Sequence, residues 1–319
     1  MDYKQIIEEN YAIKIRNLHL IDCHFGTYIY RVECENCDFF CKVHPSYDVN
    51  LKNEYEVTEF LYRKGFKVAQ ILKPKSNDFG VMIDQNCLTL QEYINGTTLE
   101  VNTASDWFMK KSSELLGQMH MLLCDYKPLP IRFGKNFFRS DTAEKKKSFF
   151  EKELESEAQE SKSRWETQIA HLDRINTFCI DIDQLTYTNS HGDYHIGQAI
   201  LQGEDVTIID WSSVCRMPVS LEIITSYVFA SPKCKCGAID AGGLSQYINE
   251  YRKYSPLSRY DIETMTYVFY FWHTICNYLP SEEIPKSYQP ISKLINSTLS
   301  WLYDNADKLS YELLNKLTI

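Results

Sequence analysis

The sequence lacks several features that would each point to a particular class of protein. It has no excess of basic residues, because 34 Lys and Arg stand against 43 Asp and Glu, for a formal net charge of −9. Nucleic acids favour a basic face, so this balance argues against a nucleic-acid partner. An acidic cleft would instead concentrate a cationic small molecule. Internal repeats and low-complexity tracts are also missing from the 319 residues, which are enough for one large domain or two modest ones.

Signals for membranes and export are missing as well. The longest apolar stretch, residues 265–279, is broken by His273 and Asn277 and is shorter than the roughly 20 residues of a membrane-spanning helix. The first ten residues are acidic and have no apolar core of the kind found in signal peptides. We therefore expect a soluble, cytoplasmic protein with no membrane partner.

The eleven cysteines are an odd number and mostly scattered. Cys34-x-x-Cys37 and Cys234-x-Cys236 form clusters, but neither is joined by a second pair at the spacing of a zinc site. Metal binding by cysteine is therefore disfavoured, and reduced thiols in the cytoplasm fit this pattern.

What the sequence does contain is one stretch, residues 189–211, in which polar groups stand beside two apolar runs. Asp193 and Gln198 are five residues apart, and Asp210 closes the second run. Residues 201–206 have turn chemistry, so a hairpin would bring Gln198 and Asp210 to one end, beside Asp193. Two carboxylates and an amide at one strand end can hold a hard cation such as Mg²⁺.

The alternative for this stretch is a surface turn whose acids are merely solvated. Asp210 is flanked by Ile208, Ile209 and Trp211. A carboxylate embedded in apolar sequence is costly to bury unless it is paired or bound to a metal. The apolar flanks therefore favour a metal site over a solvated turn.

The strings HGDYHIGQ (residues 191–198) and IIDW (residues 208–211) resemble the catalytic loop and metal segment of one family. This is the aminoglycoside phosphotransferase and choline kinase-like family, the small-molecule branch of the protein-kinase-like fold. The resemblance implies an α+β, two-lobe fold. Residues 1–94 would form an N-lobe, a small antiparallel nucleotide-binding sheet with one helix. Residues 95–319 would form a larger, mostly helical C-lobe with the catalytic loop, the metal site and the substrate-binding region.

The same resemblance implies an activity and residue roles. The enzyme would move the γ-phosphoryl group of ATP (or GTP) to a hydroxyl of a small molecule that is aminoglycoside-, choline- or sugar-like. Asp193 would be the catalytic base, and Asp210 and Gln198 would bind Mg²⁺. Relatives usually carry Asn at the position of Gln198, whose amide oxygen reaches one methylene further. The maltokinases show a similar Gln-containing string, so the change need not inactivate the enzyme.

Residues 1–50 are expected to form strands. Residues 28–32 and 39–43 are rich in aromatic and β-branched side chains, which are typical of strands. Before them, residues 22–27 contain Gly26, and this loop could cover phosphates with backbone N–H groups. With a single glycine, an ordinary hairpin turn explains the loop equally well.

Lys42 lies late in an otherwise apolar strand, and residues 51–61 have the periodicity of a helix that ends at Gly65. From the residues alone, Lys42 could be an ordinary edge-strand lysine. The resemblance places the family's lysine–glutamate ion pair on Lys42 and Glu54, with the lysine steadying the nucleotide phosphates. Glu56, two residues later in the same predicted helix, is the alternative to Glu54 as the partner of Lys42.

Residues 91–99 are similar to the hinge of this fold. By that similarity the carbonyl of Glu92 and the N–H of Ile94 would bond to the adenine edge. Gly96 marks the expected boundary between the lobes.

The second half of the sequence is expected to be mostly helical. Within it, His120 is interpreted as a packed or capping histidine, and Glu222 as a structural residue that ties down the catalytic loop. The predicted helices cover residues 104–123, 141–175 (one or two helices), 219–229, 244–254, 259–279 and 287–317, the last in one or two pieces.

Six residues separate Trp211 from Pro218, too few for the long activation segment of a protein kinase. A protein substrate is therefore disfavoured. Two questions stay open at this point. The net charge favours a cationic acceptor, whereas the string around Gln198 favours a sugar. A nucleotide-binding pseudokinase, acting as a regulator or scaffold, is the alternative to an enzyme.

Overall fold

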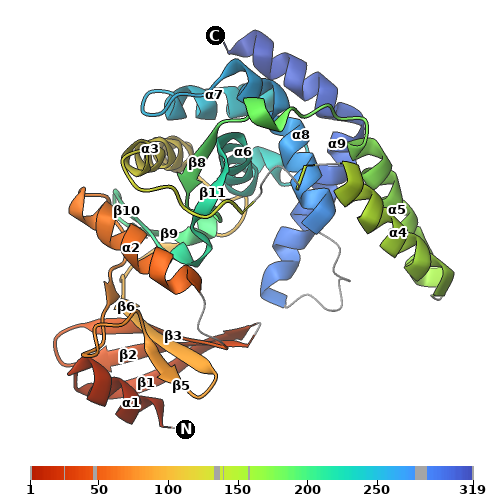
Figure 1. Cartoon of the computed structure of the whole chain (residues 1–319). Coiled ribbons are helices and arrows are strands. Elements are labelled where there is room, and N and C mark those ends of the chain that lie inside the picture. Colours follow the sequence, from red (N-terminus) through yellow and green to blue (C-terminus); the bar gives the residue numbers. More distant parts are fainter. Residues whose placement is uncertain are drawn as a thin grey trace. The chain divides into compact units, whose positions relative to one another are not determined.

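The computed structural model divides the chain into two compact units. The first comprises Met1–Thr98 and Gln198–Val214, and the second comprises Leu99–Gly197 and Cys215–Ile319. The predicted α+β class is confirmed, because a mostly antiparallel-sheet region is followed by a helical one (Figure 1). The predicted domains, residues 1–94 and 95–319, stay a prediction. The structure describes residues 2–24, 26–45, 49–132, 137–138, 140–156, 159–276 and 286–317.

An antiparallel sheet is the centre of the first unit, and it confirms the strands predicted at residues 28–32 and 39–43. Its strands run in the order β1-β2-β3-β6-β4, with β5 paired to β6. Inward-facing side chains of β2, β3 and β6, among them Val32, Cys41 and Leu90, form its core. The strands are β1 (Ile15–His24), β2 (Thr27–Cys34), β3 (Asp38–His44), β4 (Ile71–Leu72), β5 (Val81–Ile83) and β6 (Asn86–Glu92).

The N-terminus corrects one prediction, because α1 (Tyr3–Tyr11) is a helix where residues 1–50 were expected to be strands. The Asp2 side chain caps it by accepting a hydrogen bond from the N–H of Gln5. Ile7 and Tyr11 lie four residues apart on one face and are buried in the core of the sheet. Packing on the sheet thus stabilises a nine-residue helix that would be marginal alone.

The predicted helix at residues 51–61 and the predicted hairpin are both confirmed in the first unit. The helix is α2 (Val49–Arg63), and the hairpin consists of β9 (Ala199–Gln202) and β10 (Asp205–Ile208), with β7 (Thr97–Thr98) paired to β9. Gly203 turns the hairpin with a φ of +67°. The short helix η3 (Trp211–Ser213) follows it and packs on α2.

Helices dominate the second unit, with the strands β8 and β11 paired antiparallel among them (Figure 1). The predicted helices are confirmed, and residues 141–175 form two helices that pack side by side. The elements are α3 (Asp106–Leu123), α4 (Ser140–Ser156), α5 (Gln159–Ile175), β8 (Tyr187–Ser190), β11 (Cys215–Pro218), α6 (Val219–Ala230), α7 (Ala241–Tyr251), α8 (Arg259–Cys276) and α9 (Gln289–Lys316), with the short helices η1 (Ile182–Gln184), η2 (Ile196–Gln198), η4 (Pro232–Cys234) and η6 (Lys286–Tyr288).

The prediction left open whether residues 287–317 form one helix or two. In the structure α9 is a single helix of 28 residues, with a continuous buried stripe that includes Leu299 and Leu313. About two-thirds of the way along it, the carboxylate of Asp307 accepts hydrogen bonds from Arg174 and from the hydroxyl of Tyr267. These contacts leave no reason for a break in the helix. The predicted extension of α8 over residues 277–279 lies outside the described residues.

Candidate active site

In the first unit, an ion pair joins a strand of the sheet to the end of the hairpin. The ammonium of Lys42, on β3, lies 2.5 Å from Oδ1 of Asp210, which is 168 residues away in the chain. The Lys42 side chain is 10% exposed and that of Asp210 is 35% exposed. A carboxylate within apolar sequence was expected to need a partner, and Lys42 supplies one.

Local structure holds the Asp210 carboxylate in place. The hydroxyl of Ser212 donates a hydrogen bond of 3.0 Å to the same Oδ1. Next to it, the indole of Trp211 is buried against Phe66 and donates to the carbonyl of Ile208. Asp210 itself has left-handed backbone angles (φ 60°, ψ 62°), which are uncommon outside glycine and concentrate at functional sites. The fold thus holds the backbone of Asp210 in a strained conformation while its carboxylate is fixed by Lys42 and Ser212.

Glu54 is a buried carboxyl on α2, the helix that packs on η3. Burial raises the pKa of Glu54 to about 7, the charge of Lys42 lowers it, and that of Asp210 raises it. Glu54 therefore lies within the electrostatic reach of both members of the ion pair. Its predicted ion pair with Lys42 stays a prediction.

Gln198 and Asp210 lie at the open end of the same hairpin. The N–H of Ile209 donates a hydrogen bond of 2.9 Å to the carbonyl of Gln198, so the two strands stay joined up to this point. An amide and a carboxylate oxygen here make a donor set that suits a hard cation. In the described part of the chain, His, Cys, Asp and Glu side chains do not gather in groups of three or more that could hold a metal. Mg²⁺ commonly keeps water ligands and binds substrate phosphates beside one or two carboxylates.

The other predicted nucleotide residues lie at turns and strand ends of the first unit. Gly26, with a φ of +78°, turns the β1–β2 hairpin, where His24 pairs with Thr27. Glu92 ends β6 opposite Phe39, and Ile94 follows two residues later. These positions match an ordinary turn at Gly26 and a strand-to-linker transition at Glu92.

Gly96 has a packing reason to be glycine. A Cβ atom at Gly96 would lie 2.5 Å from the carbonyl oxygen of Leu201. Since β7 (Thr97–Thr98) pairs with β9 next to this point, a larger residue would push the linker off the hairpin.

In the second unit, Asp193 lies on a loop after β8, and its side chain is 50% exposed. His191 helps to fix this loop, because its Nδ1 accepts a hydrogen bond from the N–H of Asp193. His195 Nδ1 accepts a hydrogen bond from the N–H of Gly197. The proton of a neutral His195 ring is then on Nε2, which lies 3.6 Å from Oδ2 of Asp193. The loop therefore presents an accessible carboxylate with an imidazole N–H beside it.

A buried hydrogen-bond network holds the same loop in place. It confirms that Glu222 ties down the catalytic loop and that His120 is a packed histidine. Glu222, on α6, accepts a hydrogen bond of 2.7 Å from the N–H of Gly192, directly before Asp193. Its other oxygen lies 2.7 Å from Nε2 of His120, on α3, and the hydroxyl of Tyr251 is hydrogen-bonded to Nδ1 of that ring at 2.9 Å. His120 is 0% and Glu222 2% exposed. His120 is thus a packed histidine within this network.

The residues of both site regions lie within a segment that matches a known protein family. A model described as the phosphotransferase enzyme family matches residues 16–257, which include Lys42, Glu54, Asp193 and Asp210. The chain belongs to the phosphotransferase enzyme family. It is therefore an enzyme that transfers a phosphoryl group to a hydroxyl of its acceptor. No curated protein matches the chain significantly.

Solved structures of phosphotransferases share this fold. An amicoumacin kinase, hAmiN, in complex with AMP-PNP, Ca²⁺ and Ami is 12% identical, with a TM-score of 0.65 over 97% of this chain and 94% of that one. A spectinomycin phosphotransferase with ADP and spectinomycin is 13% identical, with a TM-score of 0.65 over 99% and 98%. The choline kinase LicA from Streptococcus pneumoniae is 13% identical, with a TM-score of 0.56 over 93% and 98%. At these identities the likeness concerns the fold.

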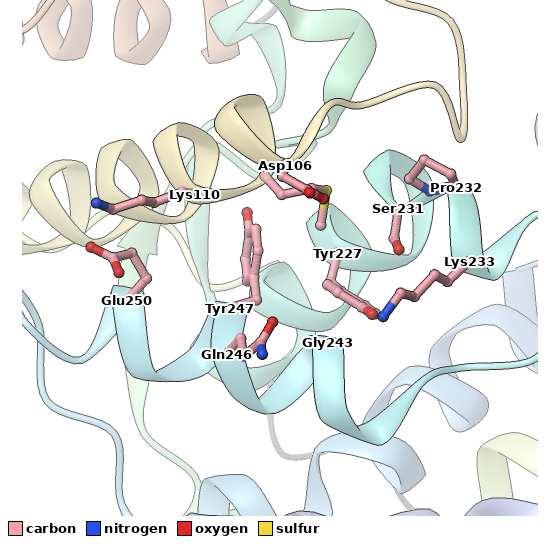
Figure 2. A pocket seen from close by; sticks show the side chains of 11 residues that line it. Asp106, Lys110, Tyr227, Ser231, Pro232, Lys233, Gly243, Gln246, Tyr247 and Glu250 are labelled. Atoms are coloured by element: carbon pink, nitrogen blue, oxygen red, sulfur yellow. The ribbon is translucent and has the colours of Figure 1, made fainter.

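This phosphotransferase has a cavity of about 650 Å³ that contains none of the predicted site residues. It lies in the second unit, between α3, α6 and α7, with charged side chains at its mouth and two tyrosines in its wall (Figure 2). Its acids are Asp106 and Glu250, its bases Lys110 and Lys233, and its tyrosines Tyr227 and Tyr247. Because Asp193 does not line it, this cavity is distinct from the candidate catalytic loop. None of the helices in the described ranges combines the length and apolar content that a bilayer crossing demands.

Two polar residues of the site region were not singled out from the sequence. Ser212 supports Asp210, and a serine directly after an Asp-Trp pair was a local signal that could have been used. His273, on α8, lies within the electrostatic reach of Asp193. Tertiary packing alone brings His273 there, so the sequence had no signal for it.

Proposed function

We propose that this phosphotransferase moves the γ-phosphoryl group of ATP, or of GTP, to a hydroxyl of a small molecule, with Asp193 as the catalytic base. The ion pair between Lys42 and Asp210 is the observation that carries the proposal. It places an ammonium and a carboxylate from distant parts of the chain at the open end of one hairpin. A triphosphate needs a cation contact and a metal-binding carboxylate close together.

Asp193 would accept the proton of the acceptor hydroxyl as the hydroxyl oxygen attacks the γ-phosphorus. Three features support this role. Its carboxylate is half exposed, its backbone N–H is bonded to His191, and its neighbour Gly192 is bonded to Glu222. Phosphoryl transfer depends mainly on positioning and charge neutralisation, so a fixed loop contributes by holding the hydroxyl in line.

Gln198 and Asp210 would hold Mg²⁺ through an amide and a carboxylate oxygen. When bound, the ion neutralises charge on the phosphate oxygens. The amicoumacin kinase was solved with AMP-PNP and Ca²⁺, which supports a divalent cation and a nucleotide here. The longer reach of Gln198 would be accommodated at the hairpin end, where its backbone is bonded to Ile209.

The remaining nucleotide contacts come from the first unit. Lys42, steadied by Glu54, would contact the α- and β-phosphates. Gly26 would cover the phosphates with backbone N–H groups, and Glu92 and Ile94 would bond to the base through their backbones. Short exposed turns, such as the one at Gly26, can offer N–H groups to anions.

The acceptor is a small hydroxyl-bearing molecule. The relatives named above act on an antibiotic or on choline, and the charge of −9 supports a cationic acceptor. A sugar is the second candidate, because of the Gln198 string.

A panel of acceptors tests the proposal. Wild-type protein is incubated with Mg-ATP and, in turn, spectinomycin, choline, ethanolamine and maltose, and ADP release is measured. At least one acceptor should raise ADP release well above the acceptor-free rate, and Asp193→Ala should remove that increase. Tight nucleotide binding with no acceptor-dependent ADP release across a widened panel would instead favour the pseudokinase. Retained turnover in Asp193→Ala would refute the role of Asp193.

A further inference from the structure

His273 is a buried histidine whose Nε2 has no hydrogen-bond partner among the described residues. It lies on α8, and 6% of the residue is exposed. A buried polar atom without a partner is destabilising, so such atoms are rare and concentrate where a ligand or water completes the bonding. His171 differs in this respect, since it is also buried but its Nδ1 pairs with the hydroxyl of Tyr270.

The surroundings of His273 connect it to the catalytic loop. Its ring lies 4.3 Å from that of Phe269 and 6.4 Å from that of Phe229, measured between ring centroids. Phe229 also contacts the ring of His195, at 5.6 Å, and His195 lies 3.6 Å from Asp193. His273 and the histidine beside Asp193 therefore contact the same phenylalanine, and the Asp193 charge acts on the His273 ring.

We propose that His273 determines acceptor specificity, with Nε2 forming a hydrogen bond to a polar group of the acceptor beside the hydroxyl that Asp193 deprotonates. This inference rests on the proposed function of Asp193. The acceptor class is then an amino alcohol or a polyol, whose second polar group is an amine or a hydroxyl. Acceptors with no such group beside the hydroxyl would leave Nε2 without a partner and would be disfavoured.

The charge state of the ring agrees with this assignment. Burial lowers the pKa of His273 to about 3, against the opposing effect of the Asp193 carboxylate. The imidazole is therefore neutral at physiological pH, and its Nε2 can act as a hydrogen-bond donor or acceptor according to tautomer. A neutral ring does not repel the ammonium of an amino alcohol, and the neighbouring phenylalanine faces favour one.

Paired leucine variants separate this role from a structural one. In H273L the unpaired nitrogen is removed, so the melting temperature should stay the same or rise, as expected when a binding residue is replaced. In the control H171L the hydrogen bond to Tyr270 is lost, so the melting temperature should fall. A fall in H273L as large as that in H171L would overturn the proposal, because His273 would then be a structural residue.

Kinetics with the full-length protein provide the second test. With ethanolamine or spectinomycin, whichever is turned over, H273L should raise the acceptor KM at least tenfold and change kcat less. H273Q keeps a polar atom at similar reach and should recover part of the loss, while H171L should leave KM unchanged. Choline is the internal control, since its quaternary ammonium has no N–H. An unchanged acceptor KM in H273L would overturn the proposal.

If wild-type protein turns over none of these acceptors, the proposed function fails first. Ring nitrogen NMR signals of His273 then decide the binding role separately. A shift of the Nε2 signal on addition of ethanolamine or spectinomycin, absent for choline, would support it. An Nε2 signal that none of the three molecules moves would overturn it.

Discussion

Two side-chain pairs, one in each unit, differ in how much water reaches them. The Lys42–Asp210 pair is partly open, because about a third of the Asp210 side chain is exposed. The His120–Glu222 pair is closed to solvent, and both Glu222 oxygens have partners within the fold. Both pairs hold a segment that carries a predicted catalytic or metal-binding carboxylate.

The difference suggests how the two pairs divide the work. A partly exposed pair can exchange partners, so under the proposed function Lys42 would turn to phosphate and Asp210 to metal without leaving a charge buried and unsatisfied. A buried, fully bonded pair is costly to disturb. Glu222 and His120 therefore serve as a scaffold for Asp193, and the following variants test this division.

The largest effect is expected from Asp193→Ala. Loss of a general base should lower kcat by about 10²–10⁴-fold, while the free energy of unfolding should change by less than about 0.5 kcal/mol, as for an exposed site. Steady-state kinetics and urea titration measure the two quantities. Asp205→Ala is the matched control, since Asp205 is an exposed acid that pairs with Lys67 outside the site.

Glu222→Ala, unlike Asp193→Ala, should have a large effect on the free energy of unfolding. It leaves His120 and the N–H of Gly192 without their buried partner, so the free energy of unfolding should fall by about 3–5 kcal/mol. Urea denaturation measures this free energy. Glu59→Ala is the control, because Glu59 pairs with Arg63 at an exposed site and its loss should cost less than about 0.5 kcal/mol. A loss as small as the control's would show that the buried network does not anchor the loop.

Lys42→Met tests the open pair. Losing a charge-assisted contact worth about 1.5–3 kcal/mol should weaken Mg-ATP binding by about 10–100-fold, measured by calorimetry. Lys67→Met is the control, because its ammonium also lies 2.5 Å from a carboxylate but at an exposed site. Equal nucleotide affinities for the two variants would remove Lys42 from the nucleotide site.

The pH dependence of stability tests Glu54. Its pKa is raised to about 7 by burial, so the folded protein binds a proton that the unfolded chain has lost between about pH 4.5 and 7. The contribution of Glu54 is complete below about pH 4.5 and is lost as the pH rises through 7, by up to about 3 kcal/mol. In Glu54→Gln, the free energy of unfolding from urea titration should differ less between pH 5 and pH 8 than in the wild type. If this difference in free energy between pH 5 and pH 8 were the same in the variant and the wild type, Glu54 would not be the titrating group.

Local sequence patterns predicted much of the fold and of the catalytic loop. The hairpin at β9 and β10 follows from two apolar runs and a turn, and the structural role of Glu222 was likewise expected. The helix α1 was missed because nine residues give a weak periodic signal, and its stability comes from packing on the sheet. The sequence also left open one or two pieces for α9, which the structure shows to be a single helix.

Contacts between distant residues were beyond local patterns. The sequence marked Lys42 and Asp210 as separate candidates, but their pairing across 168 residues depends on how the hairpin meets the sheet. The position of His273 near Asp193 likewise arises from the packing of α8 on α6. Neither contact could be inferred from spacing alone.

Measuring Mg-ATP binding and acceptor-dependent ADP release side by side, for the wild type and Asp193→Asn, separates nucleotide binding from catalysis. Both proteins should bind Mg-ATP with similar Kd, while only the wild type should pass phosphate to an acceptor. Wild-type protein without affinity for Mg-ATP, or an Asp193→Asn variant with turnover close to that of the wild type, would contradict the proposed function.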